Sequence, residues 1–251
     1  MPEVTATRPN NARSLILPGI ATLIALAILI GLGTWQLQRK AWKDGLLQQI
    51  EARAYGEPGS ILPESDWAGW RADQDEFRKV RVTGTFLNDL ETPVYGLAPG
   101  TRQGAPLQGY YIVTPLKLPT GAVVMVNRGI VPMELKDPAT RPQGRPEGEV
   151  TVTGLVRAPE ARNFFTPKDD PAKNTWFTRD PQAIAQARGL ERVAPFLIDA
   201  DATPNPGDWP RGGQTQLTLP NNHLQYALTW YGLALTLVGV FSAFTWKRIR
   251  G

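Results

Sequence analysis

The feature that most constrains this chain is an uncharged, largely apolar run near its C-terminus, from His223 to Trp246. Roughly 20 such residues in a helix cross the hydrocarbon core of a bilayer. Three basic residues follow within 247–251, and basic residues beside a span mark its cytoplasmic end. The run therefore predicts a transmembrane helix over residues 223–246.

A second apolar run, residues 15–37, predicts a partner transmembrane helix. A signal peptide would have a shorter apolar region, about 7–15 residues, with a small-residue cleavage site. Here the Ala25-Leu26-Ala27 sequence lies in the middle of the run, so we expect a retained anchor. Residues 1–14 lack the composition of a transit peptide, which favours a bacterial protein over a nuclear-encoded mitochondrial one.

Charge around the first run argues against a cytoplasmic N-terminus, because more basic residues follow the run than precede it. The second run decides the orientation, since only its C-terminal flank is basic. Two spans place both termini on the same side, and large domains translocate largely regardless of charge. We therefore expect a multi-pass bacterial inner-membrane protein with residues 1–14 and 247–251 in the cytoplasm and 38–222 forming a periplasmic domain.

The composition removes most catalytic chemistries. The 251 residues include no cysteine, which excludes disulfides, thiolate metal sites and cysteine nucleophiles, and the one histidine cannot build a multi-histidine site. The net charge is +4, but no basic patch with interleaved aromatics indicates a nucleic-acid partner. Because no nucleophile–base pair, phosphate loop or carboxylate pair is evident, we expect no enzyme and no catalytic residues.

The region between the runs predicts a β-rich domain, so the expected fold class is α+β with two flanking transmembrane helices and one or two short helices. Alternating apolar and polar residues, and a Pro-Thr-Gly turn between two of the segments, indicate strands. We expect the first helix to continue to residue 54 and connectors over 56–70, 92–106, 138–148 and 200–213. Strands are expected at 80–86, 110–118, 122–130, 150–156 and 195–199, and a helix at 182–188 capped by Asp180 and Gly189. Barrel and sandwich remain alternatives.

His223 is the candidate functional residue. It follows Pro220-Asn221-Asn222, so we expect an asparagine cap with His223 in the first helical turn. Helical spacing places Tyr226 and Trp230 near it, and Trp35 lies opposite if the two helices are antiparallel neighbours. This setting suits a flat apolar macrocycle such as haem, with His223 as an axial ligand of the iron. The alternative is an ordinary interfacial belt of aromatic residues.

Two further features have a functional and a structural interpretation. Arg128 ends an apolar strand and could receive a carboxylate, such as a propionate or a partner's aspartate; the alternative is a solvated strand end with a bulge at Gly129. Small residues at 27 and 31, and at 239 and 243, predict close packing of the two helices.

With these pieces placed, the chain resembles the Surfeit locus protein one family, membrane assembly factors for cytochrome c oxidase. The ordered motifs span nearly the whole chain and keep the same two-span layout. They include Leu32-Gly-Thr-Trp35-Gln36, Arg81-Val-Thr-Gly84, Val126-Asn-Arg128-Gly129-Ile130, Asn174-Thr-Trp176 and Asn222-His223-Leu-Gln-Tyr226. Ile130 departs from the pattern, because a tryptophan is expected after the Asn-Arg-Gly.

The resemblance implies help in building the haem-bearing subunit of a haem-copper oxidase. It implies haem a as bound cargo, with His223 at the position of the family's haem-linked histidine, and no other metal. Implied partners are that subunit, the haem a synthesis enzyme and the lipid bilayer. A cofactor-free scaffold that stabilises oxidase subunits is the alternative.

Overall fold

The computed structural model describes residues 15–98, 106–217 and 221–250, which divide into two compact units. One unit contains the residues up to Gln49 and those from Thr218 onward, and the other is Ile50–Leu217. The predictions for residues 1–14 and for Gly251 lie outside the described residues. The two units are described separately below.

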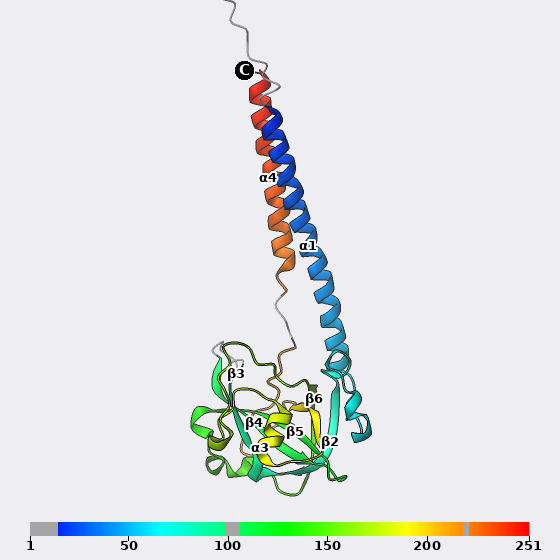
Figure 1. Cartoon of the computed structure of the whole chain (residues 1–251), viewed down its shortest axis with the longest axis vertical. Helices are drawn as coiled ribbons and strands as arrows, with labels where there is room; N and C mark the ends of the chain where they lie inside the picture. Colours follow the sequence, from blue (N-terminus) through cyan, green and yellow to red (C-terminus); the bar gives the residue numbers. More distant parts are fainter. Residues whose placement is uncertain (1–14, 99–105, 218–220, 251) are drawn as a thin grey trace, which may run out of the picture. The chain divides into compact units, whose positions relative to one another are not determined.

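The first unit contains α4 (His223–Arg250) and most of α1 (Ile16–Ala54), whose residues from Ile50 onward belong to the second unit. Both are long and apolar enough to cross a membrane. Only 6% of the apolar window of α1 and 11% of that of α4 are buried, so neither is the core helix of a soluble protein. The helices lie side by side in Figure 1. The predicted continuation of the first helix to Ala54 is confirmed.

α1 and α4 contact each other along a seam, a row of residues that recur about every 3.5 positions along each helix. In α4 the seam contains the buried Ala227 and Ala234. In α1 it passes through Gly33, where an added Cβ would lie 2.8 Å from the Tyr231 ring. Gly33 therefore lets the tyrosine ring pack against the helix backbone.

The predicted small-residue contacts are wrong. Nothing lies within 4 Å of a Cβ built on Gly31 or Gly239, and Ala27 and Ala243 are exposed. The seam runs through Gly33, two positions beyond Gly31, so the predicted pairs fall on the outer faces of the helices. Spacing alone identifies small residues that share one face of a helix. It does not identify which face is buried.

The second unit is a β-barrel with added edge strands (Figure 1). The sheet order is β1-β2-β6-β7-β5-β4-β3, and a pairing of β2 with β4 closes it. Closure is carried by Thr85 opposite Lys117 and Phe86 opposite Leu116, which settles the choice between barrel and sandwich. The strands are β1 (Gly59–Ser60), β2 (Lys79–Phe86), β3 (Thr92–Ala98), β4 (Leu107–Lys117), β5 (Val123–Pro132), β6 (Glu149–Arg157) and β7 (Val193–Ala200).

The sequence Val-x-Val-Thr-Gly occurs twice, at residues 80–84 and 150–154, and the two copies are neighbours in the barrel. β2 and β6 are antiparallel, so Val80 pairs with Gly154 and Gly84 pairs with Val150. A Cβ on Gly154 would lie 2.3 Å from the Asp199 carbonyl oxygen, and one on Gly84 would lie 2.4 Å from that of Lys117. The glycines permit close backbone approach where β6 meets β7 and β2 meets β4.

The core divides between the inside and the outside of the barrel wall. Val124, Val126 and Phe196 belong to one cluster, whereas alternate residues such as Met125 and Leu197 pack with Ile184 of α3 (Pro181–Arg188) in another. Asp180 caps α3 by accepting hydrogen bonds from Gln182 N and Ala183 N, as predicted. The remaining short helices are α2 (Ala72–Asp75) and 3-10 turns at 64–69, 88–90, 133–135, 138–140, 142–144 and 171–173.

Two strands were missed. The two-residue strand β1 lies in the segment 56–70, which was expected to be a connector. The segment 92–106 was expected to be a connector, but its first part is β3. Pro93 and Gly96 made it resemble a loop, yet β3 lies at the end of the strand order, and proline is tolerated on an edge strand. The expected strands and hairpin elsewhere are confirmed.

Candidate functional site at the end of the helix pair

His223 is the first residue of α4, where the Tyr226 N–H donates to the Asn222 carbonyl at 3.2 Å. The predicted first-turn position is therefore confirmed. Its Nδ1 lies 2.7 Å from Oε1 of Gln36 on α1. The contact joins the ends of the two apolar runs, because basic residues begin at Arg39 immediately beyond Gln36.

The Gln36 contact defines the tautomer of the imidazole. An amide carbonyl oxygen only accepts hydrogen bonds, so Nδ1 carries the proton and donates it to Gln36. In the neutral form of the ring, this tautomer has its lone pair on Nε2. Metal-bound histidines commonly have this arrangement, with the second ring nitrogen donating to an oxygen that fixes the ring orientation. His223 is therefore prepared to act as a single nitrogen ligand.

Further polar contacts fix the two helices beside each other. Asn221 Nδ2 donates to Asp44 Oδ1 at 2.7 Å, and Lys40 Nζ lies 2.5 Å from Asp44 Oδ2. On the other side of His223, the hydroxyls of Thr34 and Tyr231 are 3.2 Å apart. Contacts on both sides of the His223–Gln36 pair oppose sliding of one helix along the other.

The predicted aromatic residues lie on the same two helices as this pair. Trp35 and Tyr226 are 51% and 56% exposed, and Trp230 is partly buried. The residue of α1 that contacts the imidazole is Gln36. The predicted residue, Trp35, is its neighbour in the sequence. Trp35 and Tyr226 are therefore open to solvent on the two helices that carry the pair.

Arg128 is not a solvated strand end. The predicted bulge exists, since the register of β4 and β5 shifts opposite Arg128 and Gly129 has a φ of +116°. However, Arg128 is only 1% exposed. Arg128 follows Val124 and Val126 on the same face of β5, and that face points into the barrel core. The Arg128 side chain is buried for this reason, although the bulge begins at this position.

The Arg128 guanidinium is only partly satisfied. Nη2 donates to Asn205 Oδ1 at 3.2 Å, and Cζ lies 4.7 Å from the centre of the Phe86 ring. Nε and Nη1 are buried without a hydrogen-bond partner among the described residues. Burial lowers the pKa of Arg128 to about 10.

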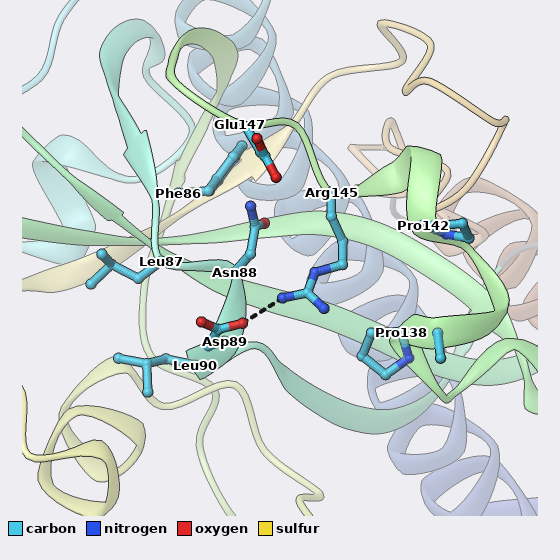
Figure 2. Close-up of a pocket in the computed structure, with 10 residues that line it drawn as sticks. Phe86, Leu87, Asn88, Asp89, Leu90, Pro138, Pro142, Arg145 and Glu147 are labelled. Atoms are coloured by element: carbon cyan, nitrogen blue, oxygen red, sulfur yellow. Dashed lines mark hydrogen bonds and ion pairs between the residues drawn. The ribbon is translucent and has the colours of Figure 1, made fainter.

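A hollow of about 650 Å³ lies beside Phe86 in the barrel domain (Figure 2). Figure 2 shows Arg145 reaching to Asp89, whose Oδ1 accepts from Nη2 at 2.6 Å. Asn88 also lines the hollow, and its Oδ1 is buried without a partner among the described residues. Across the described ranges, no group of three or more histidine, aspartate or glutamate side chains is placed to hold a metal ion.

Sequence reasoning did not single out Gln36 or Asp44. Both are polar residues on the seam stripe of α1, and Gln36 lies three positions beyond the seam residue Gly33. A polar residue that keeps the seam spacing at the end of an apolar run is the signal that could have identified Gln36 as the neighbour of His223.

The fold and the site define a membrane-anchored β-barrel protein with a hydrogen-bonded histidine where its apolar helices end. The SURF1 family model matches residues 23–235. The chain is 37% identical over 240 residues to Surfeit locus protein 1 of Xenopus tropicalis, covering 89% of this chain and 74% of that protein. It is 39% identical over 215 residues to Surfeit locus protein 1 of Homo sapiens, covering 81% and 69%. It is 40% identical over 228 residues to a SURF1-like protein of Monosiga brevicollis, covering 86% and 84%. The chain belongs to the SURF1 family, which confirms the resemblance inferred from its motifs.

Proposed function

We propose that this protein is a non-enzymatic assembly factor for a haem-copper cytochrome c oxidase. It holds haem a, or hands it over, while the haem-bearing subunit matures. Family membership supports the assembly role. The observation that carries the haem proposal is the hydrogen bond from His223 Nδ1 to Gln36, which leaves Nε2 for the iron.

In this proposal the helix pair supplies the site for the cargo. His223 Nε2 is the axial ligand, and Gln36 orients the ring. Trp35, Tyr226 and Trp230 offer apolar faces to the macrocycle. The open surface suits a ligand that must be released, because a deeply enclosed macrocycle would have to be unpacked before transfer.

Arg128 enters the proposal as a carboxylate contact for a partner or a propionate. Its buried Nε and Nη1 lack partners among the described residues, and a carboxylate satisfies such donors well. Phe86 contacts the guanidinium and also lines the hollow of Figure 2. The proposed route to Arg128 is therefore past Phe86.

We place the protein in a bacterial inner membrane with both termini in the cytoplasm and the barrel in the periplasm. The proposed partners are the haem-bearing oxidase subunit and the haem a synthesis enzyme. The two apolar helices support membrane anchoring.

The proposal is tested in a strain that lacks this gene and is complemented with variants. We expect His223→Ala to lower the haem a content of the assembled oxidase while the variant protein accumulates normally. The matched control is Gln225→Ala, an exposed polar residue on the same helical turn, which should restore oxidase haem fully.

The cofactor-free scaffold predicts a different result. If His223→Ala restores oxidase haem as well as the wild type does, while Arg128→Gln prevents co-purification with oxidase subunits, the haem role is rejected and the scaffold is retained.

A further inference from the structure

Two adjacent phenylalanines project from the loop between β6 and α3. Phe164 is 95% exposed and Phe165 is 86% exposed. Their rings are 5.3 Å apart at 87°, an edge-to-face pair. A phenylalanine buries roughly 150–250 Å² when it is covered, so this pair is a substantial apolar surface left in water.

The turn that presents these rings is held by its own hydrogen bonds. The Thr166 N–H donates to the Asn163 carbonyl at 3.1 Å, and the Phe165 N–H donates to Asn163 Oδ1 at 2.9 Å. The Asn163 N–H donates to Thr166 Oγ1 at 3.0 Å. The backbone is therefore organised with both rings facing outward.

The loop is also tied to the rest of the domain. Arg162 Nη1 donates to the Pro167 carbonyl at 2.8 Å, and Arg162 forms an ion pair with Asp169. Asp169 Oδ1 accepts from the Phe177 N–H at 2.7 Å. The Asp169 carboxylate is therefore bound within the domain, and these contacts hold the turn in place.

The uncharged turn lies between two basic residues. Residues 163–167 carry no charge, and Arg162 and Lys168 flank them as exposed basic residues, of which Arg162 is already paired with Asp169. Lys168 has no ion-pair or hydrogen-bond partner among the described residues. An apolar tip beside the exposed cation of Lys168 matches the boundary between acyl chains and anionic headgroups.

We propose that the turn of Asn163–Thr166 inserts Phe164 and Phe165 into the surface of an anionic bilayer. The chain carries two helices apolar enough to anchor it in a membrane, so a bilayer lies within reach of the domain at high effective concentration. This second membrane contact is independent of haem binding. It would steady the barrel at the lipid surface.

The absence of cysteine from the chain permits a clean test. The full-length protein carrying Phe164→Cys is labelled with an environment-sensitive fluorophore and reconstituted into phosphatidylcholine vesicles containing phosphatidylglycerol. Quenching by spin-labelled lipid is compared with quenching by iodide present on both sides. The matched control is Thr120→Cys, an exposed residue in the turn between β4 and β5.

We expect spin-labelled lipid to quench the Phe164 site several-fold more than the Thr120 site, and iodide to show the opposite order. The difference should shrink in pure phosphatidylcholine, and also when Phe165→Ser removes the second ring. Equal quenching of the two sites would overturn the proposal. So would protection of the Phe164 site from both quenchers, which would indicate a protein contact, or lipid quenching that persists unchanged with Phe165→Ser, which would indicate insertion by the label alone.

Discussion

Gln36 gives the single histidine of this chain a defined tautomer. Because Oε1 accepts from Nδ1, Nε2 is the ring nitrogen left for a ligand, and the hydrogen bond restrains rotation of the ring. An oxygen atom that accepts from the other ring nitrogen raises the basicity of a ligating imidazole and fixes its direction. At the residue scale, the candidate site is therefore a histidine and a glutamine that act together.

Replacing Gln36 tests this arrangement without removing the ligand. We expect Gln36→Leu to weaken haem a binding by about 10- to 100-fold, since the ring loses its orienting acceptor. Titration of the purified protein with haem a measures the affinity. Gln38→Leu is the control, because Gln38 is exposed on the same helix. Equal affinities for the two variants would show that Gln36 does not orient the ligand.

Two buried arginines should respond oppositely to neutralisation. Arg141 is paired with Glu91, with Nη1 3.1 Å from Oε2, so Arg141→Met strands a buried carboxylate and should cost about 3–5 kcal/mol. Arg128 has no ion-pair partner among the described residues, so Arg128→Met should leave the free energy of unfolding unchanged or raise it. Denaturant unfolding in detergent measures both. A loss for Arg128→Met as large as that for Arg141→Met would mean that Arg128 is already satisfied.

At the scale of elements, the close approach of Tyr231 to α1 depends on the small residue Gly33. Gly33→Val would push a side chain into the Tyr231 ring and should separate the helices, with a cost of about 1–3 kcal/mol and weaker haem binding. Gly31→Val is the matched control, since its Cβ meets nothing within 4 Å. Engineered cysteines across the seam report the separation by loss of disulfide formation. If the two valine variants cross-link equally well, Gly33 is not the close contact.

The strands were predictable where period and turn chemistry agreed. Pro119-Thr120-Gly121 gives a hairpin because Gly121 adopts a φ of +83°, and the alternation in β2 and β6 matches their burial. β3 was not predictable from its residues, because its pairing with β4 outweighs the breaking tendency of Pro93. Closure of the barrel depends on contacts between segments far apart in sequence, which local patterns do not encode.

The same limit applies to the candidate site. His223 stood out because it is the one histidine and begins an apolar helix. Gln36 did not, because its role depends on which face of α1 meets α4. Arg128 was identified by its place at a strand end, but its burial follows from a bulge whose inward direction the sequence does not show.

At the scale of the whole molecule, the account requires two membrane crossings with the barrel outside the cytoplasm. A Thr120→Cys variant in intact spheroplasts should react with a membrane-impermeant maleimide, because Thr120 is exposed in the barrel domain and no other cysteine competes. A cysteine after Arg250 should react only after lysis. Labelling of Thr120→Cys only after lysis would contradict the account, because it would place the barrel in the cytoplasm.

The most direct test of the central claim is the absorption spectrum of the full-length protein purified from cells that make haem a. We predict bound haem a in the wild type and a loss of at least about tenfold in His223→Ala, because the axial nitrogen is removed. A wild-type spectrum without haem, or haem retained equally by His223→Ala, would contradict the account.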